Sequence, residues 1–82
     1  MSTDAAPTDG DVRDALRRYL RERPAAADTL VGIRQWWLPE PMRGISMRQL
    51  RLALEDLIAD DEIRCTILPD GTELYSSTDA GH

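Results

Sequence analysis

Residues Ser46 to Tyr75 read SMRQLRLALEDLIADDEIRCTILPDGTELY, and their pattern sets the architecture of the chain. Ser46 and Gln49 have the spacing of a capping box, in which the serine accepts a first-turn amide proton and the Gln49 side chain reaches back to the cap. After this cap, apolar residues recur at helical spacing as far as Ile58. We therefore predict a helix that begins at Ser46 and ends around Asp60.

The two sides of this helix differ in chemistry. Arg51 lies on the border between them. The side predicted to face a core carries Met47, Leu50, Ala53, Leu54, Leu57 and Ile58. The other side carries Arg48, Leu52, Glu55, Asp56 and Ala59.

A β-hairpin is predicted directly after the helix. Residues 62–68 alternate between apolar and polar types, which is the period of a half-buried strand, and residues 72–77 form the return strand. The side chains expected to face inward in the first strand are Ile63, Cys65 and Ile67.

The turn of the hairpin, Pro69-Asp70-Gly71, allows two geometries. A two-residue Asp-Gly loop sets Ile67 opposite Leu74, whereas Pro-Asp-Gly also suits a type I turn with a glycine bulge. The apolar pattern favours the two-residue loop.

Two further helices are predicted in the first half of the chain. The first begins near Asp9, with Thr8 as its cap, and ends at about Arg23 because the residue before Pro24 is pushed out of helical geometry. Residues 25–27 are expected to be extended. The second helix is short, and either Asp28 or Thr29 caps it.

The two adjacent tryptophans, Trp36 and Trp37, have different expected roles. Trp37 shares a helical face with Leu30 and Ile33, so it is predicted to belong to the core. Trp36 falls on the flank of that face, where an indole either covers a small core or anchors an interface. Residues 38–45 hold two prolines and a glycine and are predicted to be a loop.

The composition of the chain is that of one small domain. It has 82 residues, 41% of them hydrophobic and 30% charged, and we expect a domain over residues 9–77 between solvated tails at 1–8 and 78–82. Its net charge of −5 and pI of about 4.6 argue against binding to nucleic acid or to anionic lipid. The single Cys65 and the lack of a long apolar run predict a cytoplasmic protein that does not span a membrane.

Residues that could support catalysis are few. The only histidine is the final residue, His82, and Cys65 lies on the predicted inward face of a strand with no histidine beside it. The acidic run Asp60-Asp61-Glu62 lacks the glycine and the spacing of a calcium loop. We therefore expect a protein that is not an enzyme, with no cofactor, no metal and no small-molecule ligand.

The order of these elements resembles the winged helix-turn-helix superfamily. The resemblance covers residues 9–77 and includes the phrase MRQLRLALEDLIADDEIRCTILPDGTELY, which looks like the passage from a recognition helix into a wing. It implies an α+β, winged-helix-like domain of three helices followed by a C-terminal β-hairpin. Members of that superfamily bind DNA, RNA or other proteins, so the resemblance does not assign a role.

A DNA-binding transcriptional regulator is one role that the resemblance allows. The predicted recognition helix then offers Leu52 and Glu55 beyond its first turn, and the wing offers Asp70 and Glu73, where a phosphate backbone favours cations. DNA is therefore a possible partner that the acidic charge disfavours. The residues implied as contacts are Arg43, Arg48, Gln49, Arg51 and Arg64.

A protein-binding role fits the same helix better. We predict an interaction module, either an adaptor or a small accessory subunit, that docks on another protein or on a second copy of itself through the third helix and the hairpin. Its interface has an apolar centre with a charged rim. The residues assigned to this interface are Trp36, Arg48, Arg51, Leu52, Glu55 and Ala59.

Overall fold

The computed structural model describes residues 7–78, so His82 and most of the two predicted tails lie outside it. Within that range the fold is α+β, as predicted, with three helices and a three-stranded antiparallel sheet. The elements in chain order are α1 (Asp9–Glu22), β1 (Ala27–Asp28), α2 (Leu30–Gly32), a π-helical turn (Ile33–Trp37), a 3-10 turn (Glu40–Met42), α3 (Met47–Ala59), β2 (Ile63–Ile67) and β3 (Glu73–Ser77).

Side-chain caps start all three helices at the positions expected from the sequence. The Thr8 hydroxyl accepts from the Asp11 amide at 3.1 Å, and the Asp11 carboxylate accepts from the Thr8 amide at 3.0 Å, which completes a capping box. Thr29 rather than Asp28 caps α2, because its hydroxyl accepts from the Gly32 amide. Each cap satisfies an amide that the first helical turn leaves unpaired.

At the start of α3 only half of the predicted capping box forms. The Ser46 hydroxyl accepts from the Gln49 amide at 3.0 Å, as expected. The Gln49 side chain does not return to Ser46, and its amide nitrogen donates instead to the Pro7 carbonyl oxygen at 2.7 Å. The Pro7 carbonyl, just before α1, therefore replaces the local partner, and Gln49 links the start of α3 to the start of α1.

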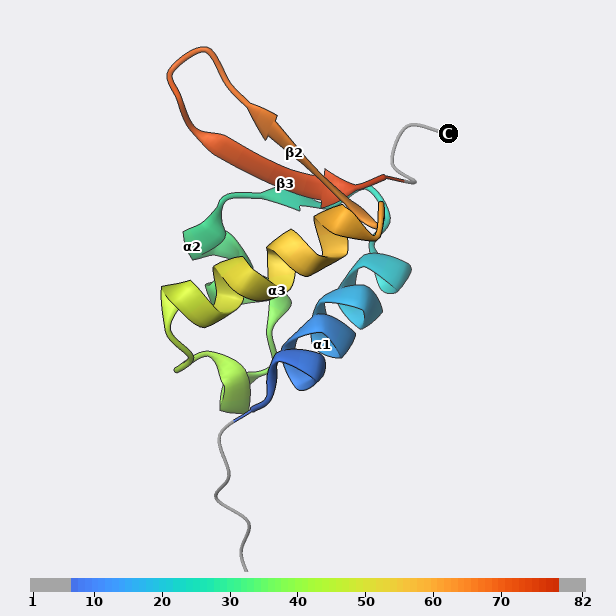
Figure 1. Ribbon diagram of the computed structural model, residues 1–82, viewed down its shortest axis with the longest axis vertical. Helices are drawn as coiled ribbons and strands as arrows, with labels where there is room; N and C mark the ends of the chain where they lie inside the picture. The colour runs from blue at the N-terminus through green and yellow to red at the C-terminus, as the bar shows by residue number, and fades with distance from the viewer. Residues whose placement is uncertain (1–6, 79–82) are drawn as a thin grey trace, which may run out of the picture.

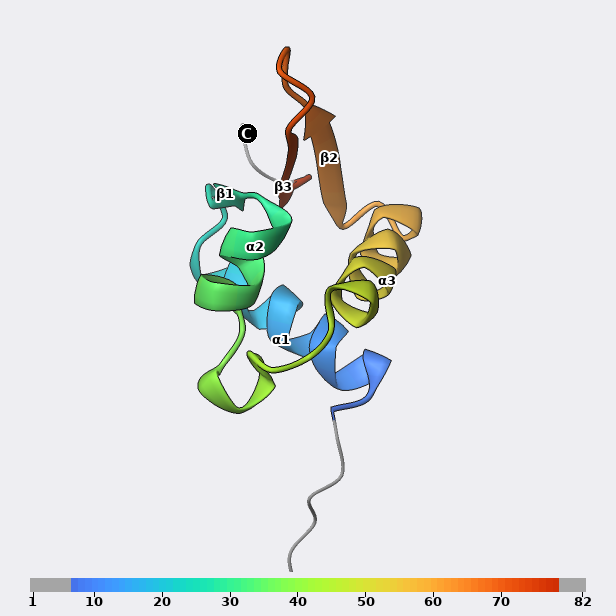
Figure 2. The same cartoon turned by 90° about the vertical axis from the view of Figure 1, so that its left-hand side faces the viewer.

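The sheet has the strand order β1-β3-β2, with β3 in the centre. β1 overlaps the segment predicted to be extended, and its two residues pair with Ser76 and Tyr75 of β3. Figure 1 shows the hairpin of β2 and β3 lying across one side of the helices, with its turn extending beyond them. In the perpendicular view α2 and α3 lie on either side below the hairpin (Figure 2).

The turn of the hairpin is the glycine-bulge alternative, so the favoured two-residue loop is wrong. The Gly71 amide donates to the Leu68 carbonyl, and the Leu68 amide donates to the Thr72 carbonyl, both at 2.8 Å. Gly71 has φ +91°, which glycine adopts without strain, and the Asp70 carboxylate accepts from the Thr72 amide. Pro69, with its fixed φ, suits the second position of this turn.

The turn sets the register of the whole hairpin. Ile67 pairs with Glu73 instead of Leu74, and Leu74 pairs with Thr66. A shift of one residue moves every side chain of a strand to the other face. Tyr75, two residues beyond Glu73, consequently lies on the face that meets the helices and is buried.

One continuous core holds the helices and the sheet together. Trp37 belongs to it, as predicted, whereas Ile58 and Ile67, which were expected to face inward, are exposed. Ile67 is 68% exposed because the outer part of the hairpin has no helix beneath it (Figure 1). The core consists of Val12, Leu16, Leu20, Ile33, Trp37, Leu38, Ile45, Leu50, Ala53, Leu54, Leu57, Ile63 and Tyr75.

Candidate functional site

The outward side of α3 is the centre of the candidate site. The residues that the sequence assigned to this side, Arg48, Leu52, Glu55 and Ala59, are all exposed. Leu52 is 43% exposed, so a large apolar side chain meets solvent in the middle of the helix. Among residues 7–78, Arg48 and Glu55 form no ion pair or hydrogen bond through their side chains, and both are free to meet a partner.

Arg51 connects α3 to the hairpin. Its guanidinium lies 3.4 Å from a carboxylate oxygen of Glu73, and the Tyr75 hydroxyl donates to the same oxygen at 3.1 Å. Burial and the Glu73 carboxylate together raise the pKa of Tyr75 to about 12, so the phenol remains a donor at all physiological pH values. These contacts link the hairpin to α3, and the Glu73 carboxylate neutralises part of the charge of Arg51.

The inner face of the hairpin adds apolar surface that the sequence did not assign to the site. Ile67 is exposed beyond the helices, and Cys65 is partly buried. Ile58 of α3 lines a hollow of about 420 Å³ together with Ile63 and Cys65 of β2. The strand pattern predicted the orientation of Cys65 and Ile67. It could not show that no helix covers the outer part of the hairpin.

Trp36 lies apart from this surface. It is 67% exposed and lines a different cavity, of about 510 Å³, formed by α1 and the segment that follows α2. Of the described residues that line this cavity, none belongs to α3. Below it Trp37 stacks on Tyr19, with 5.0 Å between ring centroids and 13° between planes. The structure therefore brings five of the six predicted interface residues together on α3 and places the sixth elsewhere.

The residues implied as DNA contacts have mixed surroundings. The Arg43 guanidinium donates to the Leu38 carbonyl at 3.2 Å, and Gln49 and Arg51 have the partners described above. Arg48 and Arg64 are exposed, and in the described part of the chain their side chains have no polar partner. Two of the five are therefore available to a phosphate, one on α3 and one on β2.

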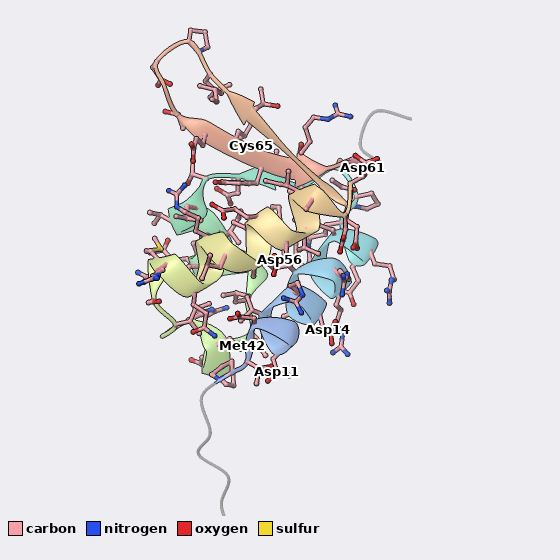
Figure 3. All side chains as sticks on the ribbon, viewed as in Figure 1. Asp11, Asp14, Met42, Asp56, Asp61 and Cys65 are labelled. Atoms are coloured by element: carbon pink, nitrogen blue, oxygen red, sulfur yellow. The ribbon has the colours of Figure 1, made fainter. Side chains whose placement is uncertain are left out.

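Acidic residues neutralise part of the basic face of α1, through Arg13 and Arg17. Arg13 pairs with Asp56 of α3 at 2.8 Å, and Figure 3 shows Asp56 on the side of α3 that lies beside α1. Arg17 binds both carboxylate oxygens of Glu62, at 2.7 and 2.9 Å, and also contacts Asp14. The hydrogen bonds from Arg17 hold the pKa of Glu62 below its ordinary value.

This ion pair predicts an acid sensitivity of folding. The pKa of Glu62 is lower in the folded than in the unfolded chain, so its stabilisation is complete above the unfolded value near 4.5 and is lost as the pH falls through the folded pKa. Arg17→Gln is expected to reduce the loss of stability between pH 6 and pH 3, measured by urea unfolding at each pH. The effect is small because both side chains are about one-third exposed.

Arg21→Gln is the matched control for this prediction. Arg21 lies on the same helix, is exposed and has no polar partner within residues 7–78. Its removal changes the net charge equally but should leave the pH dependence unchanged. An equal change of slope in both variants would assign the effect to net charge instead of to the pair with Glu62.

Residues 7–78 contain neither a cluster of metal ligands nor a membrane-spanning helix. No group of three or more His, Cys, Asp or Glu side chains there is arranged to hold a metal ion. No helix in that range has the length and apolar character needed to cross a membrane. Comparisons with protein-family models, with curated proteins and with solved structures gave no match.

Proposed function

We propose that this domain is a non-enzymatic protein-interaction module, an adaptor or a small accessory subunit that docks on a larger protein through α3 and the hairpin. The observation that carries the proposal is the exposed Leu52 in the middle of α3, bordered by Arg48 and Glu55. An apolar centre with a charged rim is the usual arrangement of a protein interface. A single exposed leucine is common on any surface, but Ile58 of the same helix and Ile67 of the hairpin are further large apolar side chains that are exposed.

We also propose that the domain is a winged helix. Three features support the relationship: the element order, the pairing of a short strand before α2 with β3, and a hairpin joined to the third helix through Arg51 and Glu73. In this assignment α3 is the recognition helix and β2 and β3 form the wing. The role of the recognition helix is then to bind a protein.

DNA binding is the competing function, and the free side chains of Arg48 and Arg64 favour it. Against it, Glu55 lies on the exposed side of α3, and Asp70 and Glu73 lie at the end of the hairpin. Each of these carboxylates opposes the phosphate contacts that supply most of the affinity for DNA. On α1, the acids paired with Arg13 and Arg17 neutralise part of the cationic surface that could compensate.

A capture experiment with two variants separates these functions. The full chain is expressed in its native cell, and Leu52→Asp is expected to abolish recovery of a stoichiometric protein partner, whereas Arg64→Ala retains it. Circular dichroism confirms that both variants are folded. In parallel, electrophoretic mobility is measured with genomic DNA fragments at low salt. Salt-sensitive binding that Arg48→Ala abolishes, together with no effect of Leu52→Asp, would overturn the proposal in favour of DNA.

A further inference from the structure

Strand β2 forms an open edge of the sheet. It pairs with β3 on one side, and no described strand lies on its other side. The Leu68 amide donates to the Thr72 carbonyl, and the Thr78 amide donates to the Glu62 carbonyl, so the even-numbered residues of this strand exchange hydrogen bonds with β3. In an antiparallel ladder bonded and non-bonded pairs alternate. The backbone N–H and C=O groups of Ile63, Cys65 and Ile67 therefore point to the open edge.

This edge lacks the features that usually prevent strand addition. Proteins protect edge strands with prolines, bulges or charged side chains, and the five residues of β2 contain only one charge, Arg64. Ile67, 68% exposed, lies at the outer end of the strand. The hollow lined by Ile58, Ile63 and Cys65 lies beside the same strand. An added strand would thus form hydrogen bonds with free backbone groups of β2 and place apolar side chains in the adjacent hollow.

The charges at the two ends of β2 indicate which kind of strand could pair with its open edge. Asp60 and Asp61 precede the strand, and Asp70 follows it. Figure 3 shows Asp61 at the base of the hairpin and Cys65 farther along it. A second copy paired antiparallel would bring Asp60 and Asp61 near the other copy's Asp70, and a parallel copy would set identical carboxylates beside each other. Like charges oppose both arrangements, whereas a strand with basic ends complements both acidic ends.

We propose that the open edge of β2 accepts, as a fourth strand, an extended segment of a partner protein with apolar residues at alternate positions and a basic residue at each end. This inference rests on the proposed protein-binding function and specifies how the partner binds. Main-chain hydrogen bonds to residues 63, 65 and 67 supply affinity, and the hollow beside Ile58 and Cys65 supplies selectivity. The acidic residues at the two ends of β2 require a basic residue at each end of the added segment.

The test uses the full chain and a fluorescein-labelled peptide, Lys-Val-Thr-Val-Thr-Val-Lys, followed by fluorescence anisotropy and amide hydrogen exchange. Binding is expected to slow exchange of the amides of Ile63, Cys65 and Ile67. Ile67→Pro removes one outward N–H without removing a bond to β3, and it should weaken binding by about tenfold, whereas Ile67→Ala retains most of it. A peptide with Glu at both ends should bind at least several-fold more weakly than the Lys peptide.

Peptide chemistry provides a second variant in case Ile67→Pro disturbs the hairpin. N-methylation of alternate peptide amides on the edge that would face β2 should abolish binding, since it removes the donors of an added strand. Equal binding of the methylated peptide, or no protection of the three β2 amides, would overturn strand addition.

The results for the two proposals are distinguishable. If the Lys peptide does not bind but Leu52→Asp still abolishes capture of the native partner, strand addition is wrong and the docking function stands. If the peptide protects β2 but Leu52→Asp leaves capture intact, the edge is the binding site and the outward side of α3 is not.

Discussion

Replacing Trp37 with alanine is expected to lower the free energy of unfolding by about 3–5 kcal/mol, the usual effect of removing a buried aromatic side chain. Trp37 is only 4% exposed and stacks on Tyr19 of α1, so the substitution leaves a cavity between α1 and the segment after α2. A domain of 82 residues is expected to be stable by roughly 4–12 kcal/mol in total. The Trp37→Ala variant should therefore lose a large part of the stability of the domain.

Trp36→Ala is the matched control, since it removes the same side chain one position earlier. Trp36 is 67% exposed, and its loss should change stability by no more than about 0.5 kcal/mol. Both variants are measured by urea unfolding followed by far-ultraviolet circular dichroism, which does not depend on tryptophan fluorescence. Equal destabilisation by the two substitutions would contradict the assignment of Trp37 alone to the core.

The second large effect is expected on α3, where Leu54→Ala should destabilise the domain by about 2–5 kcal/mol. Leu54 is completely buried and belongs to the core, whose other members come from α1, α3, the segment after α2 and the sheet. The cost combines the lost apolar burial with the cavity that remains, so it depends on how far the surrounding side chains can move.

Leu52→Ala tests the other side of the same helix. Leu52 is exposed and outside the core, so alanine, which also favours a helix, should change stability by less than about 0.5 kcal/mol. The two variants are compared by thermal and urea unfolding. If Leu52→Ala destabilised the domain as much as Leu54→Ala, the exposed leucine would have a structural role, and its value as evidence for docking would be lost.

Features that depend on residues close together in the chain could be predicted from the sequence. Thr8, Thr29 and Ser46 start the helices because a hydroxyl at that position satisfies a nearby amide, and Pro24 ends the first helix by local sterics. The helical spacing of Leu50, Leu54 and the other apolar residues of α3 likewise identified its buried side. The same pattern placed Arg48, Leu52, Glu55 and Ala59 on the outside.

The hairpin turn shows where local evidence was insufficient. Pro69-Asp70-Gly71 is compatible with two loops that differ by one residue in register, and the apolar pattern favoured the wrong one. The choice depends on which face of β3 covers the helices, and Tyr75 decides it: its ring is buried and its hydroxyl reaches Glu73 beside Arg51. No local pattern contains that information.

Contacts within a few residues therefore sufficed to predict the helices, the Thr8 and Ser46 caps, the presence of the hairpin and the exposed side of α3. Three further features could be read only from the folded chain: the partners of Gln49, Arg17 and Arg51, the separation of Trp36 from α3, and the exposure of Ile67. The partners and the position of Trp36 depend on contacts between elements that are distant in the sequence. The exposure of Ile67 depends on how far the hairpin extends past the helices. For the stretch from Ser46 to Tyr75, folding added the open edge of β2, because β1 pairs with β3 and no described strand lies on the outer side of β2.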